Sequence, residues 1–408
     1  MILRGRRLRW VRWDFLLRQR RPERYNTALL ASEKVGFPSV VAEYERMRYQ
    51  TYNHNRNYGC RIIEFVLAGY RAVSLENERL RVTVIADKGA DIYEFLYKPR
   101  DIDFMWRTRL GLRRRDHFVP TSPRSSGFHM DYYEGGWQEL FPNCGNPSLH
   151  QGAEIGQHGE ALLLPWDYAI VKDEVEEIQV RFEVRTVRTP FRLSKTLSLR
   201  RDDAALRISE QVTNEGGQEV DFSWGHHPAF GWPFLDETCR VDLPDCTIRT
   251  YAEFTPAGSR LQPDQTSRWP QATGKDGALV DLSRIPAANA EAQDMVFLDG
   301  IADGWYAVTN TSKRVGFALR YPAQVFKKLW YWQVYRGGKD YPWWSSTYNI
   351  ALEPCASMPI LSEAVARGEA LSLGAGQSLE IEMTASAYEG LDQVTGVSKA
   401  GSALGVEP

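Results

Sequence analysis

Residues 178–224, IQVRFEVRTVRTPFRLSKTLSLRRDDAALRISEQVTNEGGQEVDFSW, decide the fold. Apolar side chains take every second position from the start, at Ile178, Val180, Phe182 and Val184. The alternation returns in three further segments, represented by Leu197 and Leu199, by Leu206, Ile208 and Val212, and by Val220, Phe222 and Trp224. Thr-Pro, Arg-Asp-Asp-Ala and Asn-Glu-Gly-Gly sequences separate the segments. A period of two, interrupted by turns, predicts antiparallel β-strands rather than helices.

The same alternation extends over most of the chain. Leu80, Val82 and Val84 show it early, and Leu379, Ile381 and Met383 show it near the end. Helical patterns are confined to residues 25–34 and 361–370, and no internal repeat suggests a propeller or a solenoid. Residues 258–292 are rich in Pro, Gly, Gln and Ala, which predicts surface loops, with a boundary between two domains as the alternative. We therefore expect an all-β domain over residues 49–390, a large antiparallel sandwich or barrel with few short helices.

The two ends of the chain differ from this pattern. Residues 1–48 carry an Arg- and Trp-rich stretch whose apolar runs are too short for a secretory signal. We interpret this segment as an extension outside the fold, with a transit peptide or a true start at Met47 as alternatives. Residues 391–408 are expected to form a flexible tail.

The composition excludes several classes of protein. Hydrophobic residues make up 43% of the chain, charged residues 25%, and the formal net charge is −2, so coating of nucleic acid or of an anionic membrane is disfavoured. Five cysteines without a C-x-x-C pair indicate reduced thiols. Phosphate-binding, dinucleotide-binding, nucleophile-elbow and H-E-x-x-H motifs are missing from the sequence, so no cofactor and no metal are expected. We expect a cytoplasmic monomer or homodimer.

Two segments in the first half of the chain are candidates for a binding site. Residues 135–145, GGWQELFPNCG, predict a tight, shaped loop that carries Trp137 and Asn143, although an ordinary connection would look the same. Residues 157–166, QHGEALLLPW, place His158 beside a glycine that lets the backbone approach a ligand. A structural role for His158 is the alternative.

Residues 220–231, VDFSWGHHPAFG, contain two adjacent histidines on opposite faces of a strand. His226 shares the face of Phe222 and Trp224, whereas His227 belongs to the polar face. This favours His227 as a general acid and His226 as a core or supporting partner. Two purely structural histidines are the alternative.

Two acidic residues complete the candidates. Glu353 ends the apolar strand in residues 348–359, YNIALEPCASMP, where desolvation would raise its pKa and make it a better base. A solvated charge at a strand end is the alternative. Asp294, in the sequence QDMVFLDG, would ordinarily be a turn or cap residue.

An aromatic run occupies residues 329–348, LWYWQVYRGGKDYPWWSSTY, directly before the strand of Glu353. Its tryptophans and tyrosines could form the walls of a carbohydrate-binding cleft, because aromatic rings stack on the apolar faces of sugars. Core packing or a dimer interface is the alternative.

Taken in order, these segments resemble the aldose 1-epimerase (galactose mutarotase-like) family over residues 73–388. The resemblance is carried by the Gly-Gly and Phe-Pro-Asn loop, His158-Gly159, the sequence after His227, the Asp294 segment and Leu-Glu-Pro at Glu353. It implies a large antiparallel β-supersandwich in which Glu353 is the general base and His227 the general acid. His158 and Asp294 would bind sugar hydroxyls. The substrate-binding candidates are His158, Asp294, Asn143, Trp137, Glu160 and His226.

The resemblance implies an isomerase that interconverts the anomers of a small carbohydrate without a cofactor. Arginines that are common in the family after His-Gly and after Phe-Pro-Asn are missing, which disfavours a sugar phosphate as substrate. Two alternatives stay open. A glycoside hydrolase or lyase could pair Glu353 with Asp294 or Glu160, and a non-catalytic sugar-binding protein could share the fold.

Overall fold

The computed structural model describes residues 56–117 and 129–407, which form two large antiparallel sheets. The larger sheet has 12 strands. In spatial order they are β1 (Arg61–Leu67), β2 (Tyr70–Glu76), β3 (Leu80–Ile85), β4 (Asp91–Tyr97), β6 (Trp137–Leu140), β14 (Gly225–Phe230), β24 (Tyr348–Cys355), β23 (Lys328–Tyr335), β20 (Ala292–Asp299), β16 (Thr247–Arg249) and β17 (Thr266–Arg268), with β5 (Ile102–Asp103) paired to β4.

The smaller sheet has 8 strands. In spatial order they are β15 (Cys239–Asp242), β21 (Trp305–Asn310), β22 (Val315–Arg320), β26 (Ser378–Glu389), β12 (Ala205–Asn214), β11 (Phe191–Arg200), β10 (Glu177–Arg185) and β9 (Asp167–Asp173). Burial alternates strictly along β10 and β11, and along β12 from Leu206 onward, as the sequence alternation predicts. One face of these strands is therefore in the core and the other is solvated.

Short elements complete the described part. The two-stranded pairs are β7 (Ser148–His150) with β8 (Ala153–Ile155), β13 (Val220–Phe222) with β25 (Leu371–Leu373), β18 (Gln271–Thr273) with β19 (Leu279–Asp281), and β27 (Gln393–Val397) with β28 (Ala403–Val406). The helices are α3 (Leu361–Ala366) and the 3-10 turns η1 (Lys98–Arg100), η2 (Arg115–His117), η3 (Ala161–Leu163), η4 (Ala252–Phe254) and η5 (Ala288–Ala290).

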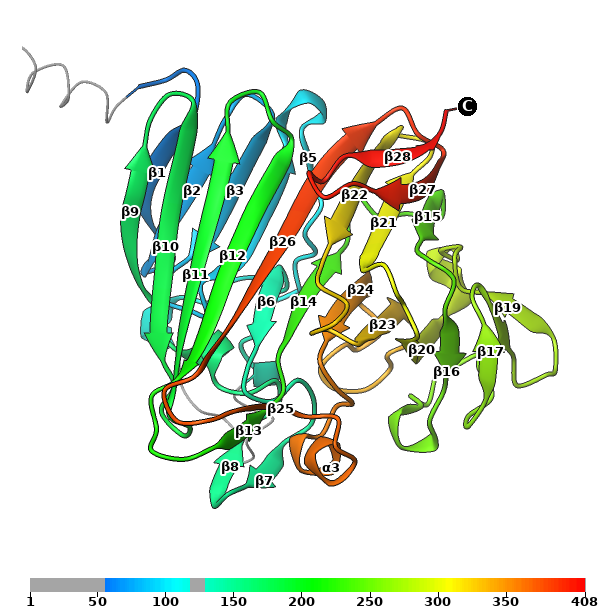
Figure 1. Ribbon diagram of the computed structural model, residues 1–408. Helices are drawn as coiled ribbons and strands as arrows, with labels where there is room; N and C mark the ends of the chain where they lie inside the picture. The colour runs from blue at the N-terminus through cyan, green and yellow to red at the C-terminus, as the bar shows by residue number, and fades with distance from the viewer. Residues whose placement is uncertain (1–55, 118–128, 408) are drawn as a thin grey trace, which may run out of the picture. The chain divides into compact units, whose positions relative to one another are not determined.

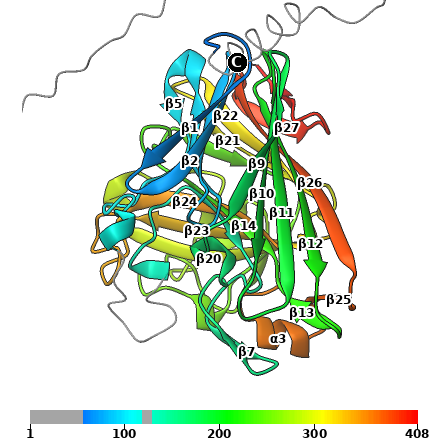
Figure 2. The same cartoon turned by 90° about the vertical axis from the view of Figure 1, so that its left-hand side faces the viewer.

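The two sheets pack face to face, as Figures 1 and 2 show. Aromatic rings join them in the core: Phe317 of β22 lies 5.3 Å from Phe95 of β4 and 5.0 Å from Phe230 of β14, measured between ring centroids. The fold is thus the large antiparallel β-sandwich with few helices that the sequence predicts. Within the described residues, no helix has the length and apolar character needed to cross a membrane.

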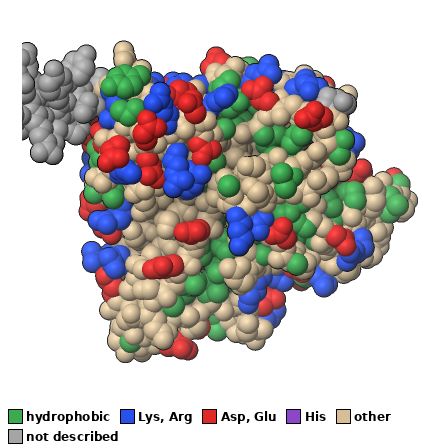
Figure 3. All heavy atoms as spheres, turned by 45° about the horizontal axis from the view of Figure 1, so that its top comes forward, with side chains coloured by type: hydrophobic (Ala, Val, Ile, Leu, Met, Phe, Trp, Pro, Cys, Tyr) green, Lys and Arg blue, Asp and Glu red, His purple; other side chains and the backbone are tan. Residues whose placement is uncertain are grey.

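Surface charge is mixed on the face drawn in Figure 3, where acidic and basic side chains intersperse. That pattern agrees with the small net charge of the sequence.

The C-terminal segment differs from the expected flexible tail. The β27–β28 hairpin occupies it, and Val394 and Val397 are buried against Trp305 and Ala307 of β21. Two apolar residues spaced this way supply the contact that orders the segment. Residues 1–48, expected to be an extension, lie outside the described residues.

Charged side chains are buried between the two sheets. The ammonium group of Lys195 on β11 lies 3.0 Å from a carboxylate oxygen of Glu139 on β6. Trp224 donates a hydrogen bond of 3.0 Å to the other oxygen of Glu139. Burial by itself would lower the pKa of Lys195, but the carboxylates of Glu139 and Glu210 outweigh burial and raise that pKa. The ion pair thus ties one sheet to the other at a fixed position.

Lys195→Met should destabilise the fold strongly, because it leaves the carboxylates of Glu139 and Glu210 buried without their cation. We expect the free energy of unfolding in urea to fall by about 3–5 kcal/mol. Lys172→Met, which removes a surface partner of Glu177, is the matched control and should leave the urea midpoint unchanged. Equal midpoints for wild type and Lys195→Met would contradict the role of the buried pair.

Candidate functional site

The register of two central strands sets the floor of the site. In the antiparallel pairing of β14 with β24, Gly225 lies opposite Cys355 and Ala229 lies opposite Ala351. His227 therefore stands opposite Glu353, and both side chains project from the same face of the sheet. His227 Nε2 lies 3.4 Å from Glu353 Oε1, and both residues are buried.

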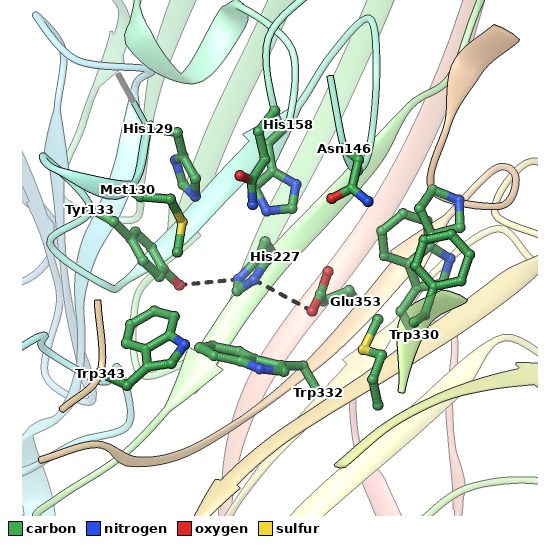
Figure 4. Close-up of a pocket in the computed structure, with 15 residues that line it drawn as sticks. His129, Met130, Tyr133, Asn146, His158, His227, Trp330, Trp332, Trp343 and Glu353 are labelled. Carbon is green, nitrogen blue, oxygen red and sulfur yellow. Dashed lines mark hydrogen bonds and ion pairs between the residues drawn. The ribbon is translucent and has the colours of Figure 1, made fainter. Parts of the chain in front are cut away.

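A cavity of about 240 Å³ opens above this pair. It is lined by His129, Met130, Tyr133, Gly145, Asn146, Gln157, His158, His227, Phe254, Met295, Trp330, Trp332, Trp343, Glu353 and Pro359. Figure 4 shows His227 and Glu353 at its centre, with Trp332 and Trp343 along one side and His129 and His158 on the other. The cavity is large enough for a small ligand and is enclosed by rings on several sides.

Small residues beside the pair leave room for the aromatic wall. Ala229 and Ala351 are the next residues along β14 and β24 on the same face. Both are fully buried, in a cluster with Trp106 and Tyr133, against which Trp332 and Trp343 pack. The centroids of the Trp332 and Trp343 rings are 5.1 Å apart. Large side chains at the two alanines would push these rings into the cavity.

Tyr133 controls the second nitrogen of the His227 ring. Its hydroxyl lies 3.3 Å from His227 Nδ1. If His227 Nδ1 carries the ring proton and donates it to the Tyr133 oxygen, Nε2 is the acceptor and faces Glu353. Only in this form can a neutral His227 accept a proton on the side of Glu353. We therefore assign the Nδ1–H tautomer to neutral His227.

Burial disfavours the charged form of each member of the pair. It raises the pKa of Glu353 well above the ordinary range, and the Cys144 thiol adds to this shift. It lowers the pKa of His227 to about 3, with a further contribution from His158. Between these two values the pair carries one exchangeable proton, on Glu353, and has no net charge. One member can then give a proton while the other accepts one.

Two more histidines lie on the polar side of the cavity. His158 donates through Nδ1 to the carbonyl oxygen of Cys144, so its Nε2 is an acceptor. Burial lowers the pKa of His158 to about 4, although this hydrogen bond opposes the shift. Burial also lowers the pKa of His129 well below its ordinary value, with the charge of His158 adding to the shift. Among the described residues, His129 Nδ1 has no hydrogen-bond partner, so it is free for a ligand.

Comparison with protein families identifies the chain at the sequence level. The family described as "Domain of unknown function (DUF4432)" matches residues 67–387. The chain belongs to the DUF4432 family. A comparison with curated proteins gives no match.

Solved structures place this DUF4432 chain in the galactose mutarotase-like fold. A proposed aldose 1-epimerase from Klebsiella pneumoniae is similar with a TM-score of 0.62 at 15% identity, over 81% of this chain and 87% of that one. A galactose mutarotase-like protein from Clostridium acetobutylicum gives 0.57 at 14% identity, over 81% and 99%. A galactose mutarotase related enzyme from Lactobacillus acidophilus gives 0.53 at 15%, over 80% and 98%. These likenesses confirm the predicted fold.

Three of the residues singled out in the sequence meet at the cavity: Glu353, His227 and His158. They come from β24, from β14 and from the loop after β8. Asp294 does not line it. Its carboxylate accepts hydrogen bonds from Ser259 Oγ, at 2.9 Å, and from Arg260 Nε, at 2.6 Å. The neighbouring Met295 faces the cavity instead, because successive residues of β20 point to opposite faces.

The other four candidates lie around the cavity rather than in it. His226 bonds Glu210 Oε2 at 3.0 Å on the core face of β14, and Trp137 donates to His226 Nδ1. Glu160 accepts hydrogen bonds from the backbone N–H groups of Val187 and Arg188. Asn143 holds its own loop by donating to the carbonyl oxygen of Gly156, just before His158.

Other lining residues were not singled out in the sequence, among them His129, Tyr133 and Met295. His129 and Tyr133 belong to a segment without periodicity, and only two polar aromatic side chains four positions apart mark it. Trp330, Trp332 and Trp343 come from the aromatic run that the sequence analysis interpreted as a possible cleft wall.

The described residues contain one group whose atoms could hold a metal ion, formed by Glu139, Glu210 and His226. It lies on the core side of the sheet. The ammonium group of Lys195, 3.0 Å from Glu139, already supplies the positive charge there. This group is therefore an ion-pair network in the structure.

The tautomer assignment can be tested without a substrate. In long-range ¹H–¹⁵N spectra, we expect the His227 ring of wild type to carry its proton on Nδ1. Tyr133→Phe removes the hydroxyl acceptor, so the share of the Nε2–H form should rise. Tyr341→Phe, which removes an exposed hydroxyl bonded to Asp131, should leave the spectrum unchanged. A wild-type ring protonated on Nε2 would refute the assignment.

Proposed function

We propose that this chain is an isomerase of the aldose 1-epimerase type, which interconverts the α and β anomers of an uncharged sugar. The observation that carries the proposal is the facing pair of His227 and Glu353 at the centre of an aromatic-walled cavity. The likeness of fold to mutarotase-like proteins agrees with it but does not by itself define an activity.

Anomer exchange needs two coordinated proton transfers. One group removes the proton of the hydroxyl on C1 while another protonates the ring oxygen, and the ring opens. C1 then turns about its bond to C2, and closure with the reverse transfers gives the other anomer. A pair that holds one exchangeable proton supplies both a donor and an acceptor. His227 and Glu353 form such a pair, and each can contribute about 10²–10⁴-fold to the rate.

The direction of the pKa shifts bears on the two roles. The resting form, with a protonated Glu353 and a neutral His227, has Glu353 as donor and His227 as acceptor. Moving the proton to His227 gives the form implied by the family resemblance, with Glu353 as base and His227 as acid. Both forms have the same charge and the same number of protons, and the reverse half-reaction interchanges the roles. The proposal therefore needs both residues, whichever form begins the cycle.

The lining of the cavity favours an uncharged sugar. None of the described residues that line it is Lys or Arg. A phosphate or a carboxylate on the substrate would be desolvated there without a cation, which is costly. Tryptophan rings can stack on the apolar faces of a pyranose.

A glycoside hydrolase fits the cavity less well. Hydrolysis requires two carboxyl groups across the scissile bond, separated by about 5–10 Å. Glu353 is the only carboxyl group among the described lining residues. Asp294 is taken up by Arg260 and Ser259, and Glu160 by the turn at Val187.

Variants of the pair test the proposal. Glu353→Gln and His227→Asn should each lower kcat for anomer exchange by about 10²-fold or more, because each removes one proton carrier. The measurement is NMR saturation transfer between anomers across a panel of hexoses, pentoses, deoxy sugars and uronic acids. Glu382→Gln and His117→Asn change exposed side chains of the same types and should keep wild-type rates. Full activity in either site variant, or no exchange with any sugar, would refute the proposal.

The pH profile provides a second test. Because the pKa of His227 is lowered to about 3, His227 stays neutral as the pH falls from 7 to 5. We expect kcat/KM at pH 5 to remain within about twofold of its value at pH 7. A histidine with an ordinary pKa near 6.5 would be about 97% protonated at pH 5, so the rate would fall roughly 25-fold between pH 7 and pH 5. Rates in Glu353→Gln give the background, and circular dichroism verifies folding at each pH.

A further inference from the structure

The cavity has an apolar end that the proposed chemistry does not use. Phe254, Met295 and Trp330 line it. Phe254 and Met295 pack against the buried cluster that contains Trp330 and Phe297. Phe297 lies 5.5 Å from Phe254 and 5.6 Å from Trp330, measured between ring centroids. The three lining side chains therefore pack against other buried apolar side chains.

This end offers no strong hydrogen-bonding group. Phe254 has no polar atom, and the Met295 thioether is only a weak acceptor. The indole N–H of Trp330 already donates to the carbonyl oxygen of Ser357, at 3.1 Å. A sugar hydroxyl turned toward these three side chains would lose its hydrogen bonds to water and gain none in return.

The opposite end is polar. Figure 4 shows His129 and Tyr133 on the far side of His227 from Trp330, with His158 above His227. His129 Nδ1 has no hydrogen-bond partner among the described residues, and His158 Nε2 is an acceptor. Asn146 and Glu353 lie between the two ends. Hydroxyl groups of a ligand are thus recognised on one side of the cavity and excluded from the other.

We infer that the cavity takes a deoxy sugar, oriented so that a methyl or methylene carbon lies against Phe254, Met295 and Trp330. For catalysis, this inference rests on the proposed function. It follows from the division of the cavity into a hydroxyl-binding end and an end that can bind only carbon. An apolar pocket discriminates against an added hydroxyl by up to about 10²-fold, so the parent sugar should be the poorer substrate.

Matched sugar pairs test the inference. Each pair consists of a deoxy sugar and the parent that carries the missing hydroxyl: fucose with galactose, rhamnose with mannose, and 2-deoxyglucose with glucose, in both enantiomers. Saturation transfer gives kcat/KM for exchange, and titration calorimetry gives the dissociation constant. We expect kcat/KM to be at least tenfold higher for the deoxy sugar in one or more pairs. Parents that equal or exceed their deoxy partners in every pair would overturn the inference.

Variants link any preference to the apolar end. Met295→Gln places an amide of similar size there, so the ratio of deoxy to parent kcat/KM should fall at least threefold. Leu279→Gln makes a polar change at an exposed residue of β19, outside the cavity lining, and should keep the wild-type ratio. An unchanged ratio in Met295→Gln would refute the placement of the deoxy carbon.

The binding data separate this inference from the proposed function. If Glu353→Gln abolishes exchange and the parent sugar is preferred in every pair, the proposed isomerase activity stands and the deoxy preference is refuted. If a deoxy sugar binds more tightly but its anomer exchange is not accelerated, the isomerase activity is refuted and the deoxy preference stands. Neither binding nor exchange with any pair would overturn both.

Discussion

The antiparallel pairing of β14 with β24 is the constraint on which the candidate site depends. It sets His227 opposite Glu353 at the centre of the larger sheet, where neighbouring strands bury both residues. The next strand continues the row, because Trp330 of β23 lies opposite Glu353. A single row of cross-strand neighbours thus supplies the two residues proposed as proton carriers and part of the apolar end. The side chains of two residues 126 positions apart in the sequence come within 3.4 Å of each other because their strands share a register.

The buried charged side chains between the sheets determine which face of β14 points into the core. His226 points into the core, where Glu210 and Trp137 bond its two ring nitrogens. A slip of β14 by one residue would exchange the faces of His226 and His227. It would also remove His226 from its partners and bury the side chain of His227 among apolar residues. The ion pair of Lys195 with Glu139 holds the neighbouring strand against the smaller sheet. The same strands therefore carry buried charged groups on their core face and the candidate site on the opposite face.

The sequence predicts the parts of this arrangement that depend on strand periodicity. Alternation along β10 to β12 predicts the sandwich, and the same alternation assigns His227 and His226 to opposite faces. It cannot show which polar side chains are already engaged. Asp294 looks available in the sequence, but Arg260, 34 residues away, takes up its carboxylate. His129 and Tyr133 escape the sequence analysis because their segment has no periodicity and joins His227 only through tertiary packing.

Burial connects the chemistry of the pair to the choice of ligand. The same desolvation that lowers the pKa of His227 and raises that of Glu353 also makes it costly in free energy to bury a ligand with a net charge in the cavity. A charged group beside the pair would shift both pKa values again, because a low dielectric strengthens every electrostatic interaction. An uncharged sugar leaves the shared proton in place and can exchange it with the carrier on either side. In the proposed reaction, neutrality of the substrate is therefore a condition for the proton transfers themselves. The inferred deoxy preference adds a condition on the hydroxyl pattern of the sugar.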